Sequence, residues 1–237
     1  MATYHVIACD VLREELLHFG ASTGHEYTYH FLEQGLHNEP ERLRASVSEA
    51  VLCPPAGTDA VLVGYGLCSN GLHGVRAGDV PLVVPRAHDC ITLFLGSRER
   101  YQAYFTDHPG TYWYTPGWIE VGAAPSRERV EQRRAEYAAA YGEENADYLL
   151  EMLDTSWTRN YSNAAYVDLG VGCRDSCVAF TRECASFFGW TCDVLAGDPR
   201  LLVMLLSGEW AEEDFLVVPP GSIVVVTHDG RLVDAAR

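Results

Sequence analysis

The hydrophobic positions of this chain alternate between two kinds of pattern. Short apolar runs with β-branched residues predict strands, and apolar residues spaced by three and four positions predict helices. The predicted strands are 5–9, 27–32, 59–67, 80–85, 164–169, 191–196, 215–219 and 223–227. The predicted helices are 11–19, a helix that begins at Pro40 and runs through Val51, 90–105, 127–157, 174–188 and 199–206.

The order of these segments predicts an α/β fold. Strands such as 59–67 are apolar on both faces, and helices separate most of them, which indicates a parallel sheet that is covered on both sides. We therefore expect three layers, with a mostly parallel sheet and helices on both faces, as in Rossmann-like or flavodoxin-like folds. The length of 237 residues suits one compact unit, 1–237, either undivided or in two subdivisions joined near 108–126. Within that connection, 110–126 is predicted to be a loop or lid.

Composition removes several classes of function. A net charge of −16 disfavours binding to nucleic acid or to anionic membrane surfaces. No apolar stretch approaches the length of a membrane span and the N-terminus has no signal-peptide pattern, so we expect a soluble, cytoplasmic protein. The chain contains no lysine, which excludes a pyridoxal-phosphate Schiff base and the lysine of a nucleotide-binding P-loop.

Three cysteines come at or just after the ends of predicted strands. Cys9 ends the first strand, Cys68 follows the third, and Cys90 follows the fourth, two residues after His88. Because ligands of an open parallel sheet bind outside the carboxyl ends of its strands, we predict that these side chains gather at one edge. Thiolate and imidazole together suit zinc, and thiolates also hold iron–sulfur clusters. Uncoordinated redox or nucleophilic thiols and buried structural cysteines are the alternatives.

The neighbouring residues favour a ligand site at this edge. A glycine-rich turn follows the third strand, and its backbone is expected to approach a cofactor or an anion; the candidate residues are Gly64, Gly66, Ser69 and Asn70. The glycine spacing is not that of a dinucleotide-binding fingerprint. Arg86 is a candidate for binding an anionic group, and Glu33 is placed to reach the same edge.

Asp89 and Cys90 stand at the predicted start of the helix over 90–105. Asp89 is a candidate general base or partner of an imidazole, and it is also a candidate N-cap. A helix N-terminus lowers the pKa of a thiol, so Cys90 is the best candidate for a reactive thiol or metal ligand. A second group, Cys173, Cys177 and Cys184, is predicted to lie on one helical face and to pack against the sheet.

The chain resembles the uncharacterised family known as domain of unknown function 1638. The similar segments are 7–9 with Leu12, 31–37, 62–68, 85–92 with 95–97, 115–118, 141–146 and 217–221. This resemblance is to proteins of methanogens and anaerobic bacteria and implies a loose link to corrinoid-dependent methyl transfer. Corrinoid-to-thiol methyltransferases use a His-x-Cys…Cys zinc motif, and 88–90 is similar to its first half, without a match of fold.

The leading hypothesis is a metal-dependent enzyme or accessory factor in methyl, one-carbon or sulfur transfer. Its metal ligands would be Cys9, Cys68, His88 and Cys90, with zinc as the first choice and an iron–sulfur cluster as the second. Arg86, Asp89 and Glu33 are the candidate catalytic residues, and a small molecule or a corrinoid protein is the expected partner. The alternatives are a binding module without chemistry and a metal-free enzyme with Cys90 as nucleophile.

Overall fold

The computed structural model of the protein describes residues 1–121 and 124–237. The chain forms two compact units: the first comprises 1–102 and 197–237, and the second comprises 103–196. Within the described residues, no helix has both the length and the apolar character that crossing a membrane requires.

A five-stranded sheet forms the centre of the first unit, with the strand order β2-β1-β3-β4-β8. Its strands are β1 (Thr3–Cys9), β2 (Glu26–Leu32), β3 (Ala60–Gly64), β4 (Leu82–Pro85) and β8 (Phe215–Val218). The first four are parallel, and β8 runs antiparallel to β4 at one edge. The predicted α/β class with a mostly parallel sheet is thus confirmed.

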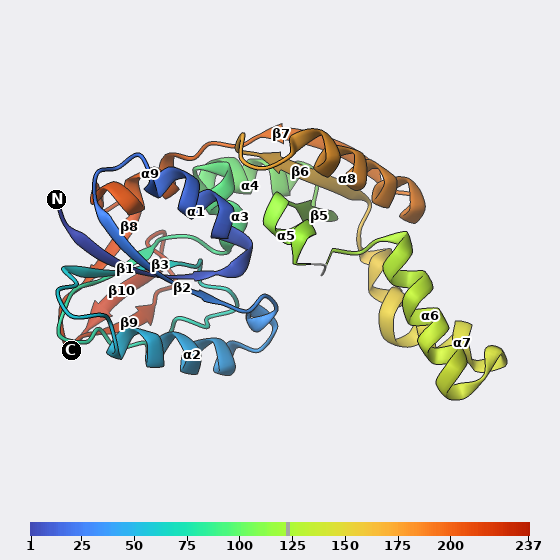
Figure 1. Cartoon of the computed structure of the whole chain (residues 1–237), viewed down its shortest axis with the longest axis horizontal. Helices are drawn as coiled ribbons and strands as arrows, with labels where there is room; N and C mark the ends of the chain where they lie inside the picture. The colour runs from blue at the N-terminus through green and yellow to red at the C-terminus, as the bar shows by residue number, and fades with distance from the viewer. Residues whose placement is uncertain (122–123) are drawn as a thin grey trace. The chain divides into compact units, whose positions relative to one another are not determined.

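Helices cover both faces of this sheet (Figure 1). On one face lie α1 (Arg13–Gly20), α3 (Cys90–Leu95) and α9 (Arg200–Ser207), and on the other lies α2 (Pro40–Leu52). Their apolar sides are buried, for example Leu16, Leu43 and Leu202, because each helix repeats apolar residues on one face only. A hairpin of β9 (Ile223–Val226) and β10 (Val233–Ala236) completes the unit.

The second unit contains its own three-stranded parallel sheet in the order β5-β6-β7. Its strands are β5 (Thr111–Tyr114), β6 (Asn163–Asp168) and β7 (Thr191–Ala196), and α8 (Arg174–Phe188) packs on them. Two further helices, α6 (Arg127–Tyr141) and α7 (Glu143–Leu150), pack against each other and are followed by a π-helical turn at 151–155 and a 3-10 turn at 156–160. The helix α4 (Arg98–Asp107) spans the boundary at residue 102.

Three details differ from the sequence prediction. The stretch 110–126 is not a plain loop, since it contains β5 and a short helix, α5 (Pro116–Glu120); residues 122 and 123 lie outside the described part. Thr115 caps α5 by accepting a hydrogen bond from the Trp118 amide, and β5 pairs with β6, a partner distant in sequence. The predicted helices over 90–105 and 127–157 are each divided, at Gly96 and Gly142, because both glycines adopt a positive φ that ends a helix.

Candidate functional site

Three thiols meet at the carboxyl edge of the first unit's sheet. Because β1, β3 and β4 are neighbours, the segments that follow them bring Cys9, Cys68 and Cys90 together. The Sγ atoms of Cys68 and Cys90 are 3.9 Å apart. The Cys90 thiol also interacts with the thiol of Cys9, so Cys90 is the central member of the group. We call these three residues the thiol cluster.

The two loops that carry Cys68 and Cys90 are paired through their backbones. The amides of Leu67 and Cys68 donate to the carbonyls of Ala87 and His88, at 2.8 Å and 3.0 Å. Gly66 lies so close to the second loop that a Cβ at this position would stand 2.6 Å from the backbone nitrogen of Asp89. The sequence analysis expected the backbone at Gly66 to approach a cofactor or an anion. In the structure it approaches the backbone of Asp89 instead.

Gly64, the other predicted glycine, also makes a packing contact. A Cβ at Gly64 would stand 2.6 Å from the Cβ of Ala8 on the adjacent strand. The structure thus accounts for both glycines by close packing around the thiol cluster.

The loop turns sharply at Cys68. Cys68, Ser69 and Asn70 have φ values of 43°, 58° and 67°, so three consecutive residues with side chains adopt the left-handed region. Each such residue costs about 1–3 kcal/mol, and strain of this kind is concentrated at functional sites. Cys68 is buried, whereas Ser69 and Asn70 are exposed. The turn thereby directs one thiol inward and leaves two predicted cofactor-binding residues at the surface.

The environments of Cys9 and Cys90 favour protonated sulfur. The hydrogen bond with Cys90, followed by burial, raises the pKa of the Cys9 thiol. The hydrogen bond with Cys68, together with burial, raises the pKa of Cys90 well above its usual value. The lowered pKa expected for Cys90 at a helix start is therefore wrong, because α3 has only 6 residues and the hydrogen bond with Cys68 and the burial outweigh the hydrogen bond with Cys9, which lowers the pKa.

Tyr65 is a member of the site that the sequence analysis missed. It is 1% exposed, and its hydroxyl has no hydrogen-bond partner of regular geometry within the described chain. This hydroxyl lies close enough to the Cys9 thiol to interact with it, and burial followed by the adjacent sulfurs raises the pKa of the phenol. A buried hydroxyl without a regular partner is costly, which points to a further polar group or ion at this position.

The sequence left two roles open for Asp89, and the structure shows both. Asp89 caps a helix, and it also lies beside other ionisable groups. Its carboxylate accepts a hydrogen bond of 3.2 Å from the Thr92 amide and so caps α3. Burial raises its pKa, while a hydrogen bond with Tyr101 opposes that change. His37 is near enough for Asp89 to oppose the lowering of the imidazole pKa that burial causes. Asp89, His37 and Tyr101 therefore form a polar group beside Cys90.

Two of the predicted residues, His88 and Glu33, are not brought to the thiol cluster. His88 is exposed, and the interaction found for its side chain is with Asp89. Glu33 is exposed and forms an ion pair of 2.9 Å with Arg42. Neither side chain contacts a cluster thiol within the described residues.

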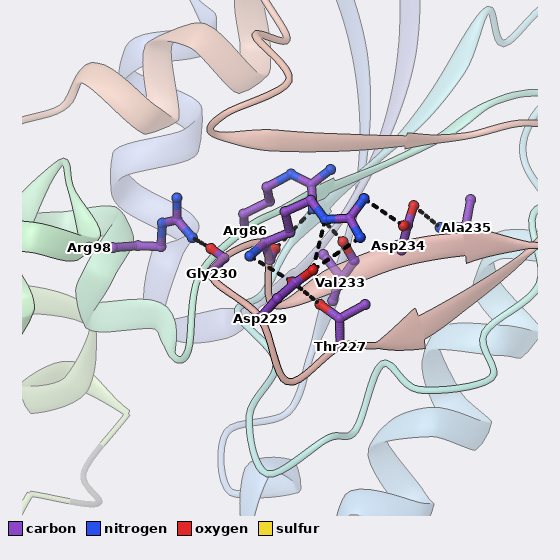
Figure 2. Close-up of polar contacts among 9 residues, drawn as sticks. Arg86, Arg98, Thr227, Asp229, Gly230, Val233, Asp234 and Ala235 are labelled. Carbon is purple, nitrogen blue, oxygen red and sulfur yellow. Dashed lines mark hydrogen bonds and ion pairs between the residues drawn. The ribbon is translucent and has the colours of Figure 1, made fainter.

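Arg86 is buried and holds the end of the chain in place (Figure 2). Its guanidinium donates to the carbonyls of Glu212, Arg231 and Val233, and the Glu212 bond is 2.7 Å long. The nearby Arg98 donates in the same way to the carbonyls of Gly230 and Glu213. These contacts assign Arg86 a structural role in fastening the β9–β10 hairpin.

Other parts of the chain offer less for chemistry. In the part of the chain that the structure describes, the thiol cluster included, no group of three or more His, Cys, Asp or Glu side chains is placed so that it could hold a metal ion. Cys177 and Cys184 are buried in the core of the second unit, as predicted, but Cys173 is exposed, because it precedes the first turn of α8. A cavity of about 130 Å³ beside α6 is lined by Arg133 and Asp154, which pair with each other.

Taken together, the fold and the cluster define an α/β protein with a partly buried three-thiol site at the carboxyl edge of its sheet. The chain belongs to the family described as "Protein of unknown function (DUF1638)", whose sequence profile matches residues 31–206. Comparisons with curated proteins and with solved structures found no match.

Proposed function

We propose that the thiol cluster is the ligand set of a thiophilic metal centre in an enzyme or accessory factor of group transfer. The observation that carries this proposal is the meeting of three cysteine sulfurs from three separate segments beside the unsatisfied Tyr65 hydroxyl. Two sulfurs bound to one tetrahedral zinc at about 2.3 Å each are about 3.8 Å apart. The separation of 3.9 Å between the Cys68 and Cys90 sulfurs is close to that value.

The raised pKa values support a metal centre over a metal-free nucleophile. Cys9 and Cys90 hold their protons at neutral pH, because a hydrogen bond with one neighbouring thiol, from Cys90 and from Cys68 respectively, and then burial raise the pKa of each. A thiol in that state is a poor nucleophile. A bound cation reverses this preference, since a coordinating thiol loses its proton. Coordination would draw Cys9 toward the other two sulfurs.

Three protein ligands leave one position of a tetrahedral metal open, as in catalytic zinc sites. Zinc is the first candidate, and an iron–sulfur cluster with three cysteine ligands is the second. At the open position such a centre supplies activation of a substrate thiol or another soft group. Methyl or sulfur transfer with a small molecule or a corrinoid protein is the reaction class that we propose for it.

The test is purification with and without oxygen, followed by elemental analysis for Zn, Fe and Co and a visible spectrum. We expect near-stoichiometric metal in the wild type and the loss of most of it in Cys68→Ser and in Cys90→Ser. Cys53→Ser is the matched control, because Cys53 is an exposed cysteine of the same unit. Retention of metal in both cluster variants, or a wild type without metal under either condition, would contradict the proposal.

A further inference from the structure

Arg44 differs from its neighbour Arg42 in having no hydrogen bond or ion pair with the described residues. It lies on α2 and is half-buried, and its Nε is buried without a hydrogen-bond partner in the described chain. Arg42, two positions earlier on the same helix, forms ion pairs with Glu33 and Glu39. The chain has 33 acidic residues and 17 arginines, so an unpaired guanidinium is not explained by a shortage of carboxylates. A buried donor without an acceptor is unfavourable unless a ligand supplies one.

The loop that carries Cys68 lies directly on this part of α2. A Cβ at Gly71 would stand 2.5 Å from the Leu43 side chain, so the absence of a side chain lets the loop reach the helix. Three residues further on, the position of a Cβ on Gly74 is 4.0 Å from the Cδ of Arg44. The stem of Arg44 therefore packs beneath the same loop that bends at Cys68.

This loop has backbone donors for which the described residues supply no acceptor. The amide of Gly71 donates to the carbonyl of Leu67 and closes the left-handed turn. Inside the turn, the amides of Ser69 and Asn70 have no acceptor among the described residues. The first turn of any helix leaves its amides free in the same way, and such amides bind anions.

We propose that Arg44 and the loop 69–74 bind an oxyanion, a phosphate or a carboxylate, that belongs to the substrate of the thiol cluster. The guanidinium fork matches the oxygens of either group, and the free amides add further donors. The amides of Ser69 and Asn70 directly follow Cys68 in the chain, so an anionic group bound to them would lie near the thiol cluster. Assignment of the anion to the substrate rests on the proposed function, whereas binding of the anion does not. Arg44 takes the role predicted for Arg86, whose donors are occupied by backbone carbonyls.

The test is titration of the full chain with inorganic phosphate and, separately, with acetate at low ionic strength, followed by calorimetry. We expect wild type to bind at least one of the two probes, and Arg44→Gln to bind it about tenfold more weakly or not at all. Arg42→Gln removes the same charge from the same helix and should bind like wild type. Arg44→Lys keeps the charge without the fork, so intermediate binding is expected. The stronger probe distinguishes a phosphate from a carboxylate ligand.

Metal content is measured on the same samples, so that the two proposals fail separately. Arg44→Gln should keep the metal content and the melting temperature of wild type. If the wild type binds the anion but contains no metal, the proposed anion site is supported and the proposed metal centre is wrong. If wild type binds neither probe, or if Arg44→Gln binds as tightly as wild type, the anion site is wrong.

Discussion

The sulfur atoms of Cys68 and Cys90 lie 3.9 Å apart, although 22 positions separate them in sequence. Two backbone hydrogen bonds between their loops and the close contact of Gly66 with the backbone of Asp89 hold them there. The cluster therefore depends on the packing of two loops. Its chemistry is expected to be sensitive to substitutions at neighbouring residues that have no sulfur atom.

Gly66→Ala is expected to separate these loops. The added Cβ would meet the backbone nitrogen, Cα and carbonyl carbon of Asp89 at 2.6–2.7 Å, and backbone cannot rotate away as a side chain does. We expect a loss of about 1–3 kcal/mol in the free energy of unfolding, measured by denaturant titration, and faster modification of Cys68 by a thiol reagent. Gly230→Ala is the control, because no atom lies within 4 Å of a Cβ there. Equal effects of the two substitutions would contradict the account.

The stability of the metal-free protein should fall at alkaline pH. Cys9 is 4% exposed and its pKa is raised above the usual value of 9.0. Below pH 9 the thiol is protonated in both states, and above pH 9 the unfolded chain loses a proton that the folded chain keeps. The free energy of unfolding should therefore decrease by about 1.4 kcal/mol per pH unit from this thiol. Denaturant titrations between pH 8 and 10 measure the slope, and Cys9→Ser, which cannot ionise there, should flatten it. An unchanged slope in this variant would show that Cys9 is not the source.

The two roles of Asp89 can be separated by two substitutions. Asp89→Ala removes the cap of α3, which should cost about 1 kcal/mol in the free energy of unfolding. Asp89→Asn keeps a capping oxygen and removes the charge. The carboxyl pKa is raised by burial, so its ionisation opposes folding as pH rises above the usual value of 3.8. Asp89→Asn should then be at least as stable as wild type at pH 7 in thermal melts. If Asp89→Asn is less stable than Asp89→Ala, this interpretation is refuted.

Arg86 is expected to contribute to the stability of the fold rather than to ligand binding. Arg86→Met leaves the carbonyls of Glu212, Arg231 and Val233 without a donor, which we expect to cost about 3–5 kcal/mol in the free energy of unfolding, because each unpaired buried carbonyl costs about 1–3 kcal/mol. Arg98→Met removes more exposed contacts to the same region, and a smaller loss is expected (Figure 2). Denaturant titration compares the two. A fully stable Arg86→Met protein with impaired phosphate binding would return Arg86 to the anion site.

Much of the fold could be predicted because its signals are local. The strands 5–9 and 59–67 and the helix that begins at Pro40 follow from apolar periodicity, and their order predicts the parallel sheet. The strand Thr111–Tyr114 was missed because it is short and lies among prolines and glycines, and it is a strand by virtue of its pairing with β6. Local patterns contain no information about such a distant partner.

By itself, the sequence determined that Cys9, Cys68 and Cys90 stand at the ends of strands, and hence that they share one edge of a parallel sheet. Only the tertiary structure decided which polar groups face that edge. It turns Arg86 toward backbone carbonyls, leaves the Nε of Arg44 without a partner among the described residues, brings Tyr65 to Cys9 and raises the pKa of Cys90. The reason is physical: strand ends follow from the periodicity of neighbouring residues, whereas burial, hydrogen bonding and pKa depend on atoms that the folded chain brings together from distant positions.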